Sequence, residues 1–320
     1  MGACALAPMA GVTDAAFRLI CARHGAGFCV SEMLSAKGWI YSKGQNRNAL
    51  NLLKRFDGEA PCALQLFGRE EKYITEAVKS LEGFGFEWFD LNFGCPAPKI
   101  ASSGEGSALM KEPLLLGRIV EAAVKATDKD VTAKIRAGWD EENINAVEVA
   151  KIIEDSGAKA ITVHPRTRAQ YYSGRADRDI IARVKESVKI PVFGNGDIDS
   201  YASAVDMYEK TKCDGIMIGR GAQGDPWIFE EISARRRGLD YKKPSIDEKF
   251  ATVKEHFRLE CELYGEKIGI LEMRKHIGWY IYGMKEAAKR REVFNKIDSS
   301  ERLIEALDEF ALLQKEYADR

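Results

Sequence analysis

The sequence lacks several features that would assign it to a specialised class of protein. No apolar run approaches the roughly 18 residues of a transmembrane helix, so we expect no membrane association. The seven cysteines are odd in number, scattered, and form no Cys-x-x-Cys pair, which argues against a disulfide framework and structural zinc. The first residues also lack the basic region of a signal peptide. Together these absences favour a protein of the reducing cytoplasm.

An excess of charge of one sign is also missing. The net charge is −1 over 320 residues, so any binding to nucleic acid must come from a local patch. We find no solenoid repeat and no low-complexity tract. With 45% hydrophobic and 30% charged residues, the chain is globular and can bury one large core or two moderate ones.

Short apolar runs alternate with amphipathic segments up to about residue 240. Candidate strands lie at 3–9, 27–33, 62–67, 86–91, 131–135, 160–164, 191–194 and 215–219. Helical periodicity lies between most of them, at 13–24, 69–81, 113–127, 142–156, 178–187 and 200–210. This alternation predicts an α/β fold, a (β/α)8 TIM barrel. A doubly wound sheet would normally carry Gly-x-Gly-x-x-Gly after its first strand, and Pro8-Met9-Ala10-Gly11 is no such motif.

The pattern changes near residue 240. A polar connector at 235–244 is followed only by helix-like segments, at 246–263, 271–284, 287–296 and 300–317. We therefore predict two domains, a barrel over residues 1–240 and a smaller all-helical C-terminal domain over residues 241–320.

One cysteine is placed differently from the others. Cys95 follows the apolar run 86–91, on a loop punctuated by glycine and proline. Parallel α/β proteins usually place their chemistry at this end of a strand. Free cysteines are mostly small buried hydrophobes, however, so a structural and a catalytic thiol are about equally good interpretations at this point.

Polar residues end nearly every predicted strand, and the carboxyl ends of barrel strands converge on one face. They are Gln65, Asn92, Lys134, Arg136, His164, Arg166, Asn195, Asp197 and Arg220. Such groups are unfavourable when left unpaired, so they indicate a large polar ligand. The glycine-rich turns 194–197 and 219–222 follow the last two strands, where barrels commonly bind phosphate.

Metal binding finds no support in the pattern. No group of histidine and acidic residues has the spacing of metal ligands, so we expect no metal. His24, His256 and His276 are interpreted as structural.

These stretches resemble the tRNA-dihydrouridine synthases, most closely the bacterial B subgroup. The resemblance runs in order along nearly the whole chain, through residues 7–14, 65–68, 90–96, 106–109, 134–139, 164–168, 194–198, 219–229 and 274–280. It implies FMN on the barrel mouth, NADPH as reductant and uridine of folded tRNA as substrate. It also implies that the barrel is the FMN-binding catalytic domain and that the helical domain binds tRNA, for which the basic stretch 285–296 is a candidate contact. That stretch is equally well explained as a solvated helix face.

The resemblance extends to individual positions. Those matching the family's flavin-binding residues are Pro8, Met9, Ala10, Gln65, Lys134, His164, Asn195, Gly196, Asp197, Gly219 and Arg220. Asn92 and Cys95 match the residues beside the target base. Arg136, Arg166 and Arg168 lie near the same mouth, where either flavin phosphate or RNA phosphate is within their reach.

The implied reaction is chemically consistent. Reducing the C5–C6 double bond of uracil needs a hydride at C6, which reduced flavin supplies from N5, and a proton at C5. A thiol with an ordinary pKa near ~8.5 is protonated at neutral pH, so Cys95 is suited to donate that proton. Lys134 would stabilise the anionic reduced flavin.

Two rival functions remain. One is an FMN-dependent reductase or dehydrogenase of a small free pyrimidine, against which the helical domain argues. The other is a tRNA-binding protein without catalysis, against which the presence of Cys95, Lys134 and His164 argues. We expect a monomer.

Overall fold

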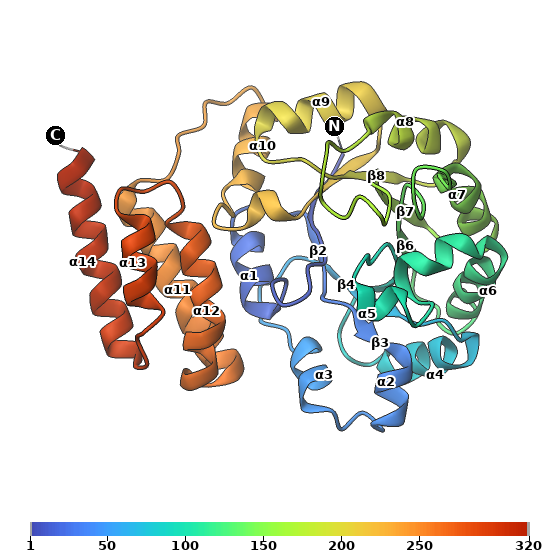
Figure 1. The fold of residues 1–320 in the computed structure, drawn as a ribbon, viewed down its shortest axis with the longest axis horizontal. Helices are drawn as coiled ribbons and strands as arrows, with labels where there is room; N and C mark the ends of the chain where they lie inside the picture. Colours follow the sequence, from blue (N-terminus) through green and yellow to red (C-terminus); the bar gives the residue numbers. More distant parts are fainter. Residues whose placement is uncertain (1, 319–320) are drawn as a thin grey trace.

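A closed ring of eight parallel strands forms the centre of the computed structural model, which describes residues 2–318 (Figure 1). The strands are β1 (Cys4–Leu6), β2 (Phe28–Val30), β4 (Cys62–Phe67), β5 (Trp88–Phe93), β6 (Val131–Arg136), β7 (Ala160–His164), β8 (Val192–Asn195) and β9 (Gly215–Ile218). β1 pairs with β9 and β2 with β4, which closes the ring, while the short β3 (Leu34–Ser35) extends it beside β4. The predicted TIM barrel is confirmed.

Helices surround the barrel and follow most of its strands. They are α1 (Ala15–Arg23), α2 (Ala36–Tyr41), α3 (Arg47–Leu52), α4 (Glu71–Leu81), α6 (Pro113–Val124), α7 (Ala146–Asp155), α8 (Arg178–Ser187), α9 (Tyr201–Thr211) and α10 (Ile228–Arg236). Three shorter elements, α5 (Pro98–Ala101), η1 (Gly106–Lys111) and η2 (Arg220–Ala222), lie in loops at the carboxyl ends of the strands. The periodicity of the sequence predicted no helix for α2, α3 or α10.

The barrel is held together by strands that are apolar on both faces. Leu64 and Ile216 are buried in one apolar cluster, and their neighbours Ala63 and Met217, which point to the other face of the same strands, are buried in a second. This is expected for a sheet whose one face fills the barrel and whose other face packs under helices. Burial of each leucine or isoleucine here stabilises the fold by roughly 1.5–3 kcal/mol. The polar side chains that line the opening lie toward the carboxyl ends of the strands.

The last part of the chain is helical and lies against one side of the barrel, next to α1 (Figure 1). Its helices are α11 (Ile246–Tyr264), α12 (Glu266–Tyr280), α13 (Ala287–Phe294) and α14 (Ser300–Ala318). The side chain of Ser245 accepts a hydrogen bond from the Glu248 N–H, and the Glu248 carboxylate accepts one from the Ser245 N–H, which fixes the start of α11. None of the described helices is long and apolar enough to cross a membrane.

Apolar contacts join the helical segment to the barrel. Leu19 and Ile20 of α1 pack with Leu259 and Leu263 of α11. Trp227, which precedes α10, packs among the buried side chains of the helical segment. The helical segment therefore buries apolar side chains against the barrel. The division into two domains at residue 240 stays a prediction.

Candidate active site at the barrel mouth

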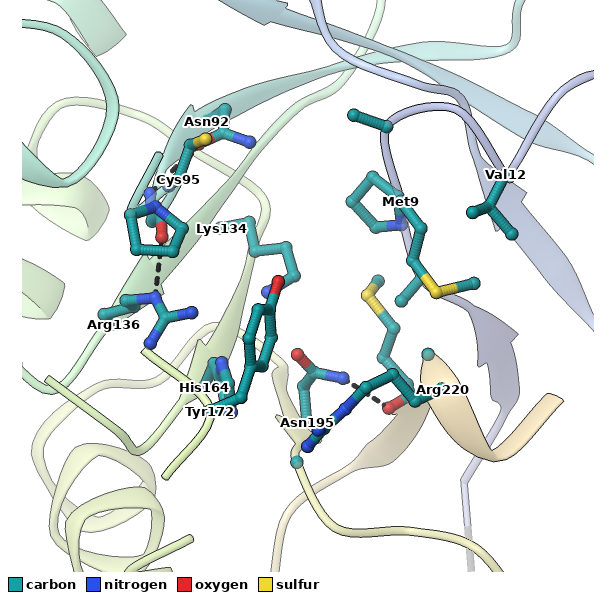
Figure 2. Close-up of a pocket in the computed structure, with 18 of the residues that line it drawn as sticks. Met9, Val12, Asn92, Cys95, Lys134, Arg136, His164, Tyr172, Asn195 and Arg220 are labelled. Carbon is teal, nitrogen blue, oxygen red and sulfur yellow. Dashed lines mark hydrogen bonds between the residues drawn. The ribbon is translucent and has the colours of Figure 1, made fainter. Parts of the chain in front are cut away.

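A cavity of about 770 Å³ opens at the carboxyl ends of the strands (Figure 2). This volume suits a cofactor together with part of a substrate. All the residues predicted to bind the cofactor line it, namely Pro8, Met9, Ala10, Gln65, Lys134, His164, Asn195, Gly196, Asp197, Gly219 and Arg220. Asn92, Cys95 and Arg136 line it as well, whereas Arg166 and Arg168 do not. In Figure 2, Cys95 and Asn92 lie on one side of the cavity, and Met9 and Val12 lie on the opposite side.

The loop that carries Cys95 is held by the side chain of Asn92. Asn92 Oδ1 accepts hydrogen bonds from the N–H groups of Gly94 (3.1 Å) and Cys95 (2.8 Å). Asn92 Nδ2 donates to Gln65 Oε1 at 2.8 Å. The carboxamide of Asn92 is thus committed to orienting the loop, and Cys95 is fixed relative to strand β5.

A buried chain of hydrogen bonds continues from Asn92 across the strands. Gln65 Nε2 donates to Asp90 Oδ2 at 2.7 Å, and Thr132 Oγ1 donates to Asp90 Oδ1 at 2.6 Å. Because every member is buried or half-buried, breaking one bond leaves an unpaired polar group in a dry place. Gln65 therefore supports the Cys95 loop through Asn92 and also lines the cavity.

Two glycines allow the Cys95 loop to pack closely. A side chain on Gly94 would meet the Ile135 main chain at 3.3 Å. Gly106 has φ +58°, and a side chain there would lie 3.0 Å from the Cys95 carbonyl oxygen. The next residue, Ser107, donates its N–H to that same carbonyl at 3.1 Å. The η1 element is therefore a second support of the loop.

The Cys95 thiol is half-buried and stays protonated at neutral pH. Burial raises its pKa, while the Ala97 N–H and the charges of Arg136 and Lys134 act in the opposite direction. A thiol of this kind is suited to donate a proton and poorly suited to attack as a thiolate.

Lys134 points from β6 into the middle of the cavity (Figure 2). Its amine makes no hydrogen bond or ion pair with any residue in the range 2–318. Loss of hydration and the charge of Arg136 lower its pKa to about 8. An amine that is charged at pH 7 and has no protein partner indicates a negatively charged or strongly accepting ligand at this position.

His164 lies beside Lys134 and is a neutral imidazole. Burial lowers its pKa far below the usual range, and the charges of Lys134, Arg136, Arg166 and Arg220 act in the same direction. Positive charge is therefore in excess at this mouth. Asp197 is the acid that is paired with its cations, since it contacts both Arg166 and Arg220.

Arg166 and Asp197 form an internal pair beneath the cavity. Arg166 donates from Nη1 and Nη2 to both oxygens of Asp197, each at 2.8 Å. Its Nε and Nη2 also donate to the carbonyls of Ser173 and Gly174, and its Nη1 lies 3.3 Å from Nε2 of His164. Asp197 also accepts the Ala176 N–H at 2.8 Å. These bonds hold the loop that follows β7, and the predicted contact of Arg166 with flavin phosphate or RNA phosphate stays a prediction.

Arg136 also has an internal task. Its Nε donates to the Gly94 carbonyl at 2.7 Å, and its Nη1 donates to the carbonyls of Thr167 and Tyr171, both at 2.9 Å. Burial lowers its pKa to about 10, which leaves it charged at neutral pH. Arg136 thus joins the Cys95 loop to the loop after β7 while it lines the cavity.

The two glycine-rich turns touch each other. A side chain on Gly221 would lie 2.1 Å from the Ile198 carbonyl oxygen, and one on Gly196 would lie 2.9 Å from the His164 ring. Gly196 also has φ +122°, a conformation that L-residues rarely adopt. Together with Arg220, whose guanidinium is about half exposed, they form a cradle of main chain and positive charge that suits a phosphate group.

Tyr172 lines the cavity although no sequence pattern predicted it. Half of its surface is exposed, and the guanidinium groups of Arg220 and Arg136 lie 4.7 and 5.7 Å from its ring centre. The loop from 165 to 177 carries it into the mouth. The sequence prediction collected only residues directly at strand ends, and a long loop cannot be placed by strand order alone.

Arg168 lies outside the cavity. Its guanidinium lies 4.7 Å from the ring centre of Trp139, and the Lys111 amine lies 4.1 Å from the same ring. On and beside α13, the predicted basic stretch exposes Lys285, Lys289, Arg291 and Lys296. A contact of either region with tRNA stays a prediction.

The geometry agrees with comparisons to known proteins. The profile of the family described as dihydrouridine synthase (Dus) matches residues 5–316. A Rickettsia conorii protein named probable tRNA-dihydrouridine synthase is 45% identical over 306 residues, which cover 95% of this chain and 92% of that protein. tRNA-dihydrouridine synthase B of Pseudomonas aeruginosa is 42% identical over 298 residues, covering 92% and 89% respectively.

Solved structures support the fold. Morphinone reductase superposes with a TM-score of 0.52 at 12% identity, covering 76% of this chain and 87% of its own. A structure titled TcOYE with pHBA gives a TM-score of 0.51 at 11% identity, covering 76% and 91%. At such low sequence identity, these two structures support only the barrel architecture.

Proposed function

The chain belongs to the dihydrouridine synthase family, and from that premise we propose that its barrel mouth holds FMN and that Cys95 protonates the target uridine. Dihydrouridine synthases are flavin-dependent oxidoreductases, and the relatives at 41–45% identity are named for action on tRNA. That naming speaks against the two rival functions, a reductase of free pyrimidines and a tRNA-binding protein without catalysis.

The residues around the cavity fit a flavin with a phosphate. Gly196, Gly219 and Arg220 would hold the phosphate, and Lys134 and His164 would contact the polar edge of the ring. The observation that supports this fit is the unpartnered Lys134 amine, half-buried among further cations. When bound, the cofactor supplies a hydride to uracil C6 after its reduction by NADPH.

Cys95 supplies the other half of the reduction. Addition of a hydride at C6 must be balanced by a proton at C5, which the protonated thiol delivers. The thiolate left behind lies near the charges of Arg136 and Lys134, which stabilise it until solvent returns the proton. Asn92 acts by keeping the Cys95 loop in place.

The rest of the chain would serve the RNA. A uridine in folded tRNA must leave its base stack to reach the residues that line this cavity. The exposed cations on and beside α13 are our candidate for binding the tRNA backbone, since phosphate contacts position RNA without reading its sequence. We further propose that the protein acts as a monomer in the cytoplasm, where its free cysteines stay reduced.

The test is reconstitution with purified components. The protein, loaded with FMN and supplied with NADPH, is incubated with tRNA that lacks dihydrouridine, and nucleosides are quantified by mass spectrometry. Dihydrouridine should appear in tRNA, while free uridine should remain unchanged. If fully FMN-loaded protein reduces free uracil or uridine but not tRNA, the proposed substrate is wrong.

A further inference from the structure

A second group of titratable side chains lies where the helical segment packs on α1. His256 and Glu260 lie one turn apart on α11, and His276 of α12 faces them. All three are fully buried. Residues four apart share one face of a helix, which brings the first two together. The two histidines, which the sequence predicted to be structural, therefore share a closed space with a carboxyl group.

Three potential ligand atoms converge here. Glu260 Oε1 lies 3.4 Å from His256 Nε2 and 3.9 Å from His276 Nε2. In a tetrahedral zinc site with bonds of about 2.0–2.1 Å, neighbouring ligand atoms lie about 3.4 Å apart. Small side-chain adjustments would therefore let one ion contact all three residues.

These atoms find no hydrogen-bond partner among residues 2–318. Both oxygens of Glu260, Nε2 of His256 and both ring nitrogens of His276 are buried without one. A buried polar group left in this state destabilises a protein by about 1–3 kcal/mol, so such groups are rare singly and rarer in clusters. The carboxylate oxygens and the unprotonated nitrogen of each imidazole have lone pairs that require an electron-accepting partner.

The Tyr280 hydroxyl orients the ring of His256. A hydrogen bond of 3.2 Å joins His256 Nδ1 to the Tyr280 hydroxyl. With the proton assigned to Nδ1, the lone pair of Nε2 faces Glu260, and metal-binding histidines commonly use their second nitrogen in this way.

The surroundings are acidic. Asp14, the N-cap of α1, is a second buried carboxyl group, and its charge and that of Glu260 act on each other. Lys275, a half-buried cation, is paired with Glu272. A dication would balance both carboxylates.

We propose that His256, Glu260 and His276 bind a divalent cation of the zinc class, with Asp14 or a water molecule completing its coordination. Two histidines with a glutamate are an established donor set for zinc. The ion would tie α11 to α12 against α1 and so hold the helical segment on the barrel. A proton on Glu260 is the competing occupant.

The direct test is the metal content of the full chain. The protein is expressed without a histidine tag in zinc-supplemented medium, and metals are measured by mass spectrometry after dialysis. We expect about one zinc per chain in the wild type, and less than about a tenth in Glu260→Gln and His276→Gln. His24→Gln is the matched control, because His24 lies at the end of α1 against Glu230 and Trp227 and should leave the content unchanged.

A second readout covers variants that fail to fold. Chelation should lower the thermal midpoint of the wild type and added zinc should restore it, and zinc-edge X-ray absorption should report two imidazoles. Wild type with less than a tenth of an equivalent and no response to added zinc, manganese or cobalt would mean that a proton occupies the cluster. Equal zinc in the wild type and the Glu260→Gln/His276→Gln double variant would likewise overturn the site.

Discussion

The barrel mouth and the junction between α1 and α11 both bury titratable groups, but the two clusters differ in sign and in access. The mouth gathers Lys134, Arg136 and Arg220 around an open cavity, and its surplus is positive. The junction buries the carboxyl groups of Asp14 and Glu260 beside two histidines in a closed space. Buried cations without a partner favour an anionic ligand and buried carboxyl groups favour a cation, which supports the cofactor proposed for the mouth and the ion proposed for the junction.

The largest effect should come from the mouth. Replacing Cys95 by alanine removes the proposed proton donor, so formation of dihydrouridine in a single turnover should slow by about 10²–10⁴-fold. Flavin content should be unchanged, because no bond to the cofactor is lost. Cys261→Ala, on α11, is the control and should turn over normally. Normal turnover by Cys95→Ala would show that the Cys95 thiol is not the proton donor.

Lys134→Met should weaken FMN binding roughly tenfold to a hundredfold, since a charged hydrogen-bond donor is lost from a poorly hydrated site. Titration of the flavin-free protein by flavin fluorescence measures this. Lys159→Met, at an exposed position before β7, should bind FMN as the wild type does. If the Lys134 and Lys159 variants bind FMN with equal affinity, the charge of Lys134 does not contribute to FMN binding.

The lowered pKa of Lys134 predicts a pH dependence. Lys134 is charged below a pH of about 8 and neutral above it, so the affinity for FMN should fall as the pH rises from 7 to 9.5. The expected loss is roughly tenfold, and Lys134→Arg should abolish the dependence because a guanidinium stays charged throughout. An identical pH profile for both proteins would assign the effect to another group.

Charges on α13 should have a smaller effect. Lys289→Ala combined with Arg291→Ala should raise the KM for tRNA about two- to fivefold, leave kcat unchanged and flatten the salt dependence. Lys79→Ala with Lys151→Ala removes two exposed charges from barrel helices and provides the comparison. If both double variants have the same KM for tRNA and the same salt dependence, the cations of α13 lie on a solvated helix face that does not contact tRNA.

The smallest change in turnover should come from the junction. Glu260→Gln should keep kcat within about twofold, because the cluster has no part in the reaction, while the thermal midpoint shifts by several degrees. Melting curves and single-turnover rates of the same preparation test this separation. A large loss of kcat in Glu260→Gln with normal flavin content would show that the junction affects the reaction at the mouth, which we treat as independent of it.

Sequence reasoning located the barrel because its strands are continuous apolar runs. The predicted bounds of 62–67 and 160–164 match β4 and β7, and Arg178–Ser187 matches α8. The helix predicted at 271 begins at Glu266 instead. The predicted bounds leave Gly269 in a loop, whereas in the structure it allows α12 to approach α11, since a side chain there would meet the Cys261 main chain at 2.8 Å.

The site was predicted less completely than the fold. Residues at strand ends could be collected from strand order, and all of them except Arg166 line the cavity. The pairing of Arg166 with Asp197, the entry of Tyr172 and the meeting of His276 with Glu260 depend on contacts across loops and between helices. Spacing along the chain contains no information about such contacts.

The pairing of β1 with β9 has a consequence for how the protein is made. Cys4–Leu6 cannot take its place in the ring until Gly215–Ile218 has left the ribosome. β1 can pair early with β2, but at about 5–20 residues per second it waits roughly 10–40 seconds for its second partner, β9. During that interval one edge of the growing sheet stays open, which makes a nascent chain of this topology dependent on protection from aggregation.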